Sequence, residues 1–226
     1  MKQFSCFDIL GPIMVGPSSS HTAGAARLGK IAAIIAGEED IKEVKFYLHG
    51  SFGKTYKGHG TDKALVAGVL GMDPWDARLK NSFMFAKEKK IKFDFIEEDL
   101  GEVHPNTVKF EIKKFDESVI EILGSSIGGG NIIINEIDKM VVDFTGNYPA
   151  LIIRLKDIPG MISKVSTIIY EAGINVAYLK FYRKIKGLNA TMIFETDSAI
   201  CEEVVSSIKQ LGNIYSIRCV NPITEG

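Results

Sequence analysis

The sequence predicts an α+β protein of two domains, and three observations support this prediction. Residues 1–145 mix helical and strand patterns, whereas residues 148–226 alternate short apolar strands with amphipathic helices. Between them, the polar, glycine-containing run 143–147 is typical of a linker. At 226 residues the chain is long enough for two modest domains.

The expected elements of residues 1–145 follow from local composition and periodicity. An alanine-rich helix over 23–36 is preceded by serines, and serine is a preferred helix N-cap. The glycine-containing segment 49–62 is expected to be a loop that ends in a helix cap at Thr61 or Asp62. The other expected elements are a helix over 63–70 and strands over 42–48, 90–96, 107–115, 119–126 and 132–137.

The run Gly128-Gly129-Gly130-Asn131 separates the last two of these strands. Successive glycines let the backbone bulge or turn left-handed. One interpretation is a β-bulge that re-aims the strand. The other is a loop at a small-ligand pocket or at an interface with a partner, and the sequence favours neither.

Residues 148–226 show the clearest periodicity of the chain. Apolar residues recur at helical spacing after the turn 156–160, and Gly173 is typical of a helix end. Alternating residues such as Met192 and Phe194 indicate half-buried strands. The expected elements are strands over 150–155, 174–184, 188–194 and 214–220, and helices over 162–172 and 199–211. Their order, strand–helix–strand–strand–helix–strand, is the ferredoxin-like βαββαβ arrangement.

Composition argues against several classes of protein. Hydrophobic residues make up 46% and charged residues 24% of the chain, which is ordinary for a globular protein. The formal net charge of −1 gives no reason to expect nucleic acid or an anionic membrane as a partner. No apolar run approaches the roughly 20 residues that span a bilayer, and no signal-peptide pattern is present. We therefore expect a cytoplasmic protein.

The three cysteines, Cys6, Cys201 and Cys219, are far apart in sequence. An odd and scattered set argues against a disulfide framework, and it lacks the close spacing of zinc or iron–sulfur ligands. Cys201 and Cys219 fall at apolar positions of an expected helix and strand, where buried and inert thiols are common. We expect no metal cluster held by this chain alone.

The run Ser18-Ser19-Ser20-His21-Thr22 is the strongest candidate for a functional site. It precedes an expected helix, so its hydroxyl and N–H groups lie at the positive end of the helix dipole, where carboxylates and phosphates bind. Helix capping alone is the simpler alternative. Three serines followed by His21, which titrates near neutral pH, favour a substrate site.

The other three histidines differ in their surroundings. His59 is flanked by glycines that let another backbone approach closely, which favours a functional role. His49, at the end of an expected strand, could be structural or functional. His104 precedes a proline in a polar loop and is expected to be solvated. Three further side chains could orient a substrate or simply face water: Lys54, Lys57 and Asp62.

Three segments together carry a family resemblance: 16–22, 57–62 (Lys-Gly-His-Gly-Thr-Asp) and 128–131. With them, the chain resembles the β subunit of the iron–sulfur-dependent bacterial L-serine dehydratase. Residues 148–226 resemble an ACT domain, in which the turn Asp157-Ile158-Pro159-Gly160 is moderately specific. Residues 1–145 resemble the allosteric substrate-binding domain of some phosphoglycerate dehydrogenases. The likeness covers nearly the whole chain.

This resemblance implies a lyase that converts L-serine into pyruvate and ammonia without pyridoxal phosphate. It implies a [4Fe–4S] cluster ligated by an α subunit, whose open iron acts as a Lewis acid on the β-hydroxyl. This chain would then require that partner and be inactive alone. It would contribute two catalytic acid/base candidates, His21 and His59. The substrate-binding candidates are Ser18, Ser19, Ser20, Thr22, Thr61 and Asp62.

The ACT-like domain supports a second hypothesis, a non-catalytic subunit that senses an amino acid. ACT domains usually bind ligands near their first turn, at an interface between two such domains. The matching residues are Asp157, Pro159, Gly160, Met161 and Asn175. Alternatively the domain only self-associates through exposed sheet edges. The sequence leaves open which histidine is the base, and whether serine or threonine is the substrate.

A stand-alone Ser–His hydrolase is a third and weaker hypothesis. The adjacent residues Ser20 and His21 cannot easily align as nucleophile and base, and the chain carries no nucleophile-elbow motif.

Overall fold

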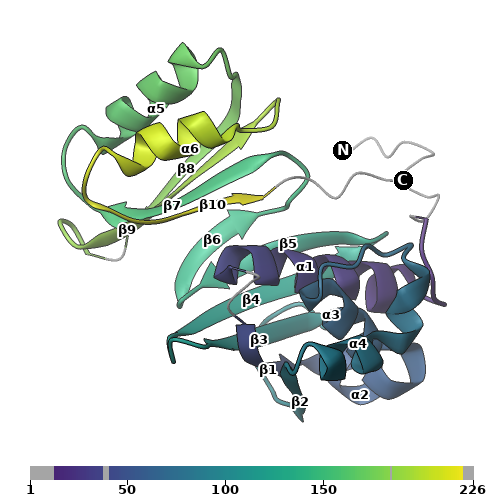
Figure 1. Cartoon of the computed structure of the whole chain (residues 1–226). Coiled ribbons are helices and arrows are strands. Elements are labelled where there is room, and N and C mark those ends of the chain that lie inside the picture. The colour runs from purple at the N-terminus through teal and green to yellow at the C-terminus, as the bar shows by residue number, and fades with distance from the viewer. Residues whose placement is uncertain (1–12, 38–40, 184, 221–226) are drawn as a thin grey trace, which may run out of the picture. The chain divides into compact units, whose positions relative to one another are not determined.

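The computed structural model describes residues 13–37, 41–183 and 185–220. They form two compact units that divide between Thr145 and Gly146 (Figure 1). Helices and strands mix in the first unit, and the second has the strand–helix order of a ferredoxin-like fold. The α+β class expected from the sequence is therefore confirmed.

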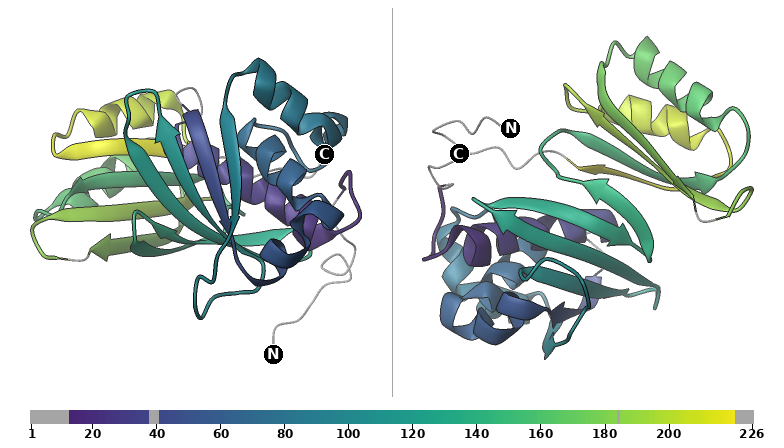
Figure 2. Two further views of the ribbon diagram at one scale, coloured as in Figure 1. Left: turned by 90° about the horizontal axis from the view of Figure 1, so that it is seen from below. Right: turned by 180° about the vertical axis from the view of Figure 1, so that it is seen from behind.

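A six-stranded sheet forms the frame of the first unit, in the order β2-β1-β3-β4-β5-β6. Strands β1 and β2 are parallel, and all other neighbours are antiparallel. The helices cover one face of this sheet (Figure 2). The strands are β1 (Ile41–Leu48), β2 (Lys92–Glu97), β3 (Thr107–Lys114), β4 (Val119–Gly128), β5 (Asn131–Ile137) and β6 (Met140–Phe144).

The described residues of this unit include six helical segments: the π-helix η2 (Ser19–Gly24), α1 (Ala25–Ala36), α2 (Gly50–His59), α3 (Thr61–Val69), the 3₁₀ segment η4 (Ala77–Asn81) and α4 (Ser82–Glu88). Helices α1 and α3 pack closely because glycines lie between them. A Cβ on Gly29 would come 2.4 Å from the Leu65 carbonyl oxygen, and one on Gly68 would come 2.1 Å from that of Ala26. The helix that carries the serine run is thus held by backbone-to-backbone packing.

The three-glycine run forms the tip of the β4–β5 hairpin. Gly128 pairs with Asn131, which leaves Gly129 and Gly130 as a two-residue loop with φ of 61° and 81°. Positive φ at both positions is the requirement of a type I′ hairpin turn. A bulge directly precedes it, between Ser126 and Gly128. The structural interpretation of this run therefore accounts for its glycines.

The segment 49–62 is helical, so its prediction as a loop is wrong. Helix α2 occupies most of it and ends at Gly60, whose φ of 70° fits a left-handed helix end. The glycines suggested a loop, but Gly53 packs inside, where a Cβ would come 2.8 Å from the Leu48 carbonyl oxygen. Thr61 and Asp62 lie within helix α3, and neither caps it, because Gly60 holds the N-cap position.

The second unit is a four-stranded antiparallel sheet in the order β10-β7-β9-β8. Two helices cover one of its faces (Figure 2). Its core joins Leu151 and Ile153 of β7 to Val165 of α5 and Ile208 of α6. The elements are β7 (Ala150–Lys156), α5 (Met161–Glu171), β8 (Val176–Arg183), β9 (Asn189–Thr196), α6 (Glu202–Lys209) and β10 (Ile214–Val220).

Cys201 is exposed, so the prediction that it is buried is wrong. The physical reason is that α6 begins at Glu202, and Cys201 occupies its N-cap instead of an inward-facing helical position. Cys219 is half-buried beneath the helices. Cys6 lies outside the described residues.

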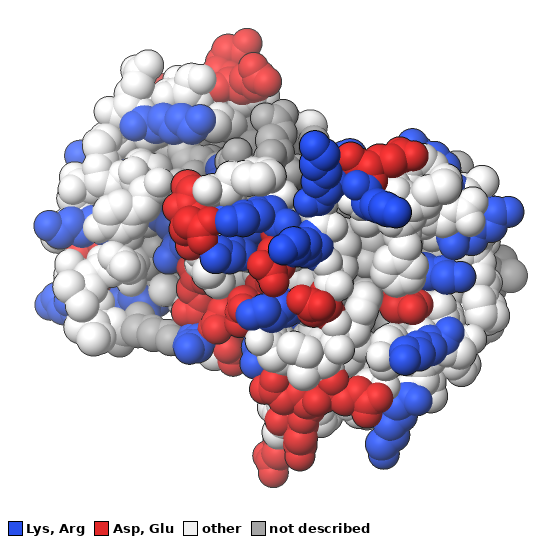
Figure 3. All heavy atoms as spheres, turned by 60° about the horizontal axis from the view of Figure 1, so that its bottom comes forward, with Lys and Arg blue, Asp and Glu red and all other residues white. Residues whose placement is uncertain are grey.

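On the face shown in Figure 3, lysine and arginine lie close to aspartate and glutamate near the centre, and aspartate and glutamate gather at the lower edge. Ion pairs join lysine and glutamate side chains of the first unit, among them Lys45 with Glu111 at 2.7 Å and Lys109 with Glu98 at 3.1 Å. Among the described residues, no helix is both long and apolar enough to cross a membrane.

Candidate functional site

The serine run caps and begins a helix. The Ser18 side chain accepts a hydrogen bond from the His21 N–H at 3.1 Å, and is the N-cap. The helical backbone begins at Ser19, four residues earlier than the sequence suggested, as the π-helical stretch η2. Such stretches are rare and frequently mark functional sites. The N–H groups of Ser19 and Ser20 donate to no other described residue, so they are available at the positive end of the helix.

His21 lies at the centre of the site and is only 8% exposed. Its Nε2 is 3.2 Å from Ser51 Oγ, across a sequence separation of 30 residues. One side of its ring packs against buried Phe52 at a centroid distance of 5.2 Å. Helices η2 and α2 therefore hold this imidazole between them.

His59 lies beside His21, with 4.8 Å between the ring centroids. It is the last residue of α2 and is exposed, in contrast to His21. The structure thus brings together the two histidines that the sequence singled out as catalytic candidates. One is held inside the protein, and the other faces outward at the rim.

The pKa of His21 reflects its surroundings. Burial, and secondarily the neighbouring His59, lowers the pKa of His21 below its ordinary value of 6.5. His21 is therefore neutral at pH 7 and can accept a proton. A protonated His59 would make a second charge on His21 still less favourable.

The remaining candidates of these segments occupy different depths. Thr22 is buried, and its methyl group fills the space where a Cβ on Gly16 would be. Thr61 is fully buried, and its hydroxyl has no hydrogen-bond partner within the described part of the chain. Asp62 is half-buried, which raises the pKa of its carboxyl group, although the Lys63 N–H donates to it at 2.8 Å.

Ser51 and Phe52 are contacts of His21 that the sequence analysis did not identify. Helical periodicity contained the signal, because residues 51 and 59 are two turns apart and lie on one face of a helix. The signal was lost when the segment 49–62 was interpreted as a loop. Treated as a helix, it would have placed Ser51 next to the histidine pair.

The other two histidines each accept a hydrogen bond from a nearby backbone N–H group. His49 Nδ1 accepts a hydrogen bond from the Leu100 N–H at 3.1 Å, at the start of α2. His104 is exposed, as expected, and its Nδ1 accepts from the Asn106 N–H at 3.1 Å. Lys54 and Lys57 are exposed on α2.

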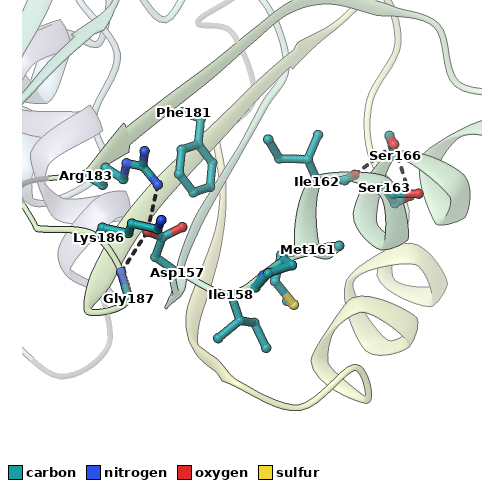
Figure 4. Close-up of a pocket in the computed structure, with 12 residues that line it drawn as sticks. Asp157, Ile158, Met161, Ile162, Ser163, Ser166, Phe181, Arg183, Lys186 and Gly187 are labelled. Atoms are coloured by element: carbon teal, nitrogen blue, oxygen red, sulfur yellow. Dashed lines mark hydrogen bonds and ion pairs between the residues drawn. The ribbon is translucent and has the colours of Figure 1, made fainter.

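In the second unit, four of the five ACT-type candidates line a pocket of about 1090 Å³, namely Asp157, Pro159, Gly160 and Met161. Figure 4 shows that the Asp157 carboxylate is already engaged: it accepts from Arg183 Nη1 at 3.0 Å and from the Gly187 N–H at 2.9 Å. These interactions lower its pKa, the Gly187 N–H most strongly. Asn175 does not line this pocket and instead donates to Asp197 at 2.5 Å.

Comparison with known proteins matches both units. The family model described as "Serine dehydratase beta chain" matches residues 5–82, and the ACT domain model matches residues 150–213. The "Probable L-serine dehydratase, beta chain" of Bacillus subtilis is 42% identical over 96% of this chain and 98% of its own length. The "L-serine dehydratase, beta chain" of Peptoniphilus asaccharolyticus is 39% identical over 92% of this chain and 94% of its own length.

A more distant match extends the relationship to another class of protein. The D-3-phosphoglycerate dehydrogenase of Methanocaldococcus jannaschii is 30% identical over 63% of this chain, which corresponds to 27% of that protein. The first two matches span nearly the full length of both partners and include the segment that holds His21 and His59. The chain therefore belongs to the family of L-serine dehydratase β chains.

Proposed function

We propose that this chain is the β subunit of a lyase that converts L-serine into pyruvate and ammonia, together with an α subunit. Two groups must leave the substrate, the α-proton and the β-hydroxyl. This chain's own residues are suited to the first of these tasks. Family membership supports the substrate, and the geometry around His21 supports the role.

The observation that carries the proposal is the pair His21 and His59. His21 is neutral at working pH because its pKa is lowered, so it can take the α-proton. His59, exposed beside it, can pass that proton to solvent. A buried base next to an exposed histidine gives the proton a route out of the site.

The helix start supplies the binding group for the substrate carboxylate. The N–H groups of Ser19 and Ser20, which donate to no other described residue, lie with their hydroxyls at the positive end of η2. Thr22 and Thr61 are buried, and we propose that they form part of the wall of this binding position. Ser18 holds the first turn through the His21 N–H, and half-buried Asp62 is the side chain that we propose for the substrate amine.

The described residues of this chain do not fit an iron–sulfur cluster. Such clusters are held by cysteine thiolates, and the two described cysteines, Cys201 and Cys219, both belong to the second unit. No group of three potential ligand side chains occurs among residues 13–37, 41–183 and 185–220. We therefore assign the [4Fe–4S] cluster to the α subunit and propose that this chain is inactive alone. We propose the cytoplasm as its location.

Reconstitution tests this proposal directly. The purified chain should release no pyruvate from L-serine, and addition of an anaerobically reconstituted α subunit should produce turnover. His21→Ala and His59→Ala should each lower kcat in that complex by at least about 100-fold, the usual contribution of a general base. Lys80→Ala, an exposed change on η4, is the control. Unchanged rates in both histidine variants would overturn the assignment.

A second function is favoured by the pocket of the second unit. Its apolar floor and basic rim, with Phe181, Arg183 and Lys186, suit a small regulatory ligand such as an amino acid (Figure 4). Strand β8 is an edge of the sheet and exposes Tyr178 and Leu179, so we propose self-association there.

Calorimetry and sedimentation separate these possibilities. Saturable binding of serine that persists in His21→Ala, in a chain that supports no turnover, would favour a regulatory subunit. Leu179→Lys should convert a self-associated species into a monomer if β8 is the interface. Sedimentation unchanged by Leu179→Lys would argue against that interface.

A further inference from the structure

The orientation of the His21 ring depends on a single hydroxyl group. Ser51 Oγ is 3.2 Å from Nε2, whereas Nδ1 makes no hydrogen bond with any described residue. Packing by Phe52 and His59 restrains the plane of the ring but does not distinguish its two nitrogens. In a neutral imidazole, the hydrogen bond at one nitrogen decides which nitrogen carries the proton.

Ser51 is itself firmly positioned. Its N–H donates to the Pro105 carbonyl oxygen at 2.8 Å, and its own carbonyl oxygen accepts from Thr55 Oγ1 at 2.8 Å. Gly50 lies so close to this loop that a Cβ would come 2.7 Å from the same Pro105 oxygen. The first turn of α2 is thus packed directly against residue 105, and this contact aims Ser51 at His21.

We propose that Ser51 is a positioning residue that holds His21 as the Nε2–H tautomer and leaves Nδ1 as the nitrogen that accepts the substrate proton. This inference rests on the proposed role of His21 as the base. In this arrangement Nε2–H donates to Ser51 Oγ, and the lone pair of Nδ1 stays free. The opposite arrangement, with Ser51 as the donor, would put the ring proton on Nδ1 and leave no free lone pair for the substrate.

The tautomer can be measured on this full chain without its partner. Long-range ¹H–¹⁵N NMR of the imidazole rings above pH 7 should show His21 as a single Nε2–H tautomer. Ser51→Ala should produce a mixture of tautomers, and Ser51→Thr, which keeps the hydroxyl, should restore the single form. Tyr56→Phe is the matched control, because it removes a hydroxyl from the same helix, and the ring of Tyr56 packs on Phe95.

Activity of the complex with the α subunit provides the second measurement. Ser51→Ala should lower kcat between about 10-fold and 100-fold with little change in KM, because the base is misdirected while carboxylate binding is intact. Ser51→Thr should recover most of kcat, and circular dichroism should show that all variants fold.

Three results would overturn the proposal. The first is an Nδ1–H tautomer in the unmodified chain. The second is a tautomer that Ser51→Ala leaves unchanged. The third is a mixture of tautomers in Ser51→Ala with unchanged kcat, which would mean that His21 is not the base. A wild-type complex that produces no pyruvate would instead contradict the proposed function, and the NMR result would still report separately on the Ser51–His21 contact.

Discussion

Gly58, next to His59, is less favourable than alanine for the stability of the isolated chain. It lies in the last turn of α2, is exposed, and is not among the residues with positive φ. A Cβ built on it would meet nothing within 4 Å. Alanine is favoured over glycine at such a helical position by up to about 1 kcal/mol. The fold of this chain therefore gives no reason for a glycine there.

We predict that Gly58→Ala stabilises the isolated chain and impairs the complex. Because the position is near the helix end, where residues fray, we expect a gain of about 0.5–1 kcal/mol in the free energy of unfolding of the first unit. This corresponds to a rise in Tm of roughly 1–4 °C. In the complex, the added methyl group occupies the surface beside His59, where we expect substrate or the α subunit to approach closely, so kcat or affinity for the α subunit should fall.

Thermal denaturation of the isolated chain and titration with the α subunit measure the two effects. Gly60→Ala is the matched control on the neighbouring residue. Gly60 has a φ of 70°, and an L side chain in that conformation costs about 1–2 kcal/mol, so this variant should lose stability. If Gly58→Ala raises Tm while kcat, KM and affinity for the α subunit stay unchanged, nothing approaches this surface closely and the reasoning is refuted.

Three further predictions concern other parts of the structure. Since the pKa of His21 is lowered, its neutral form persists below pH 6.5, and kcat/KM should fall only as the pH drops below that value. His59→Gln removes the repulsion from the second ring and should move this fall in kcat/KM to higher pH. A pH–rate profile measures both effects. Gly68→Ala should lower the unfolding free energy by at least about 2 kcal/mol in urea titrations, because its Cβ would come 2.1 Å from a backbone oxygen of α1; an unchanged midpoint would contradict the close packing. In a Cys6→Ser background, Ellman's reagent should react rapidly with exposed Cys201. It should react slowly with half-buried Cys219, because burial raises the pKa of that thiol. Cys201→Ser should abolish the rapid phase.

The elements that the sequence predicted well are those whose apolar periodicity decides their structure. Strands β3 and β7 and helix α5 follow this rule, and their bounds differ by only a residue or so from expectation. Strand β6 and the segments η4 and α4 were not anticipated. They are short, so that tertiary packing contributes more to them than local periodicity.

The largest error, at α2, has a different cause. Glycine was interpreted there as a sign of irregular backbone, because sequence alone does not distinguish the reasons for a glycine. In α2, Gly53 is required by a close contact with Leu48, Gly60 by a left-handed helix end, and Gly58 by neither. The two histidines that the sequence singled out do lie side by side, and their catalytic role stays a prediction. Ser51, which contacts His21, could be identified only by treating this segment as a helix.

In the proposed site, His21 takes the α-proton and His59 passes it to solvent. A base is effective when it is neutral and fixed, and His21 meets both conditions through burial, Phe52 and Ser51. Burial of the same ring also isolates it from water, so a proton that it takes must leave through a neighbour. His59 is that neighbour, and its exposure at the end of α2 is what a proton exit requires. A site with both rings buried would trap the proton, and one with both exposed would lose the lowered pKa. We therefore propose that the pairing of one buried and one exposed histidine serves the reaction, and we expect that changing the exposure of either should impair turnover even with both rings present.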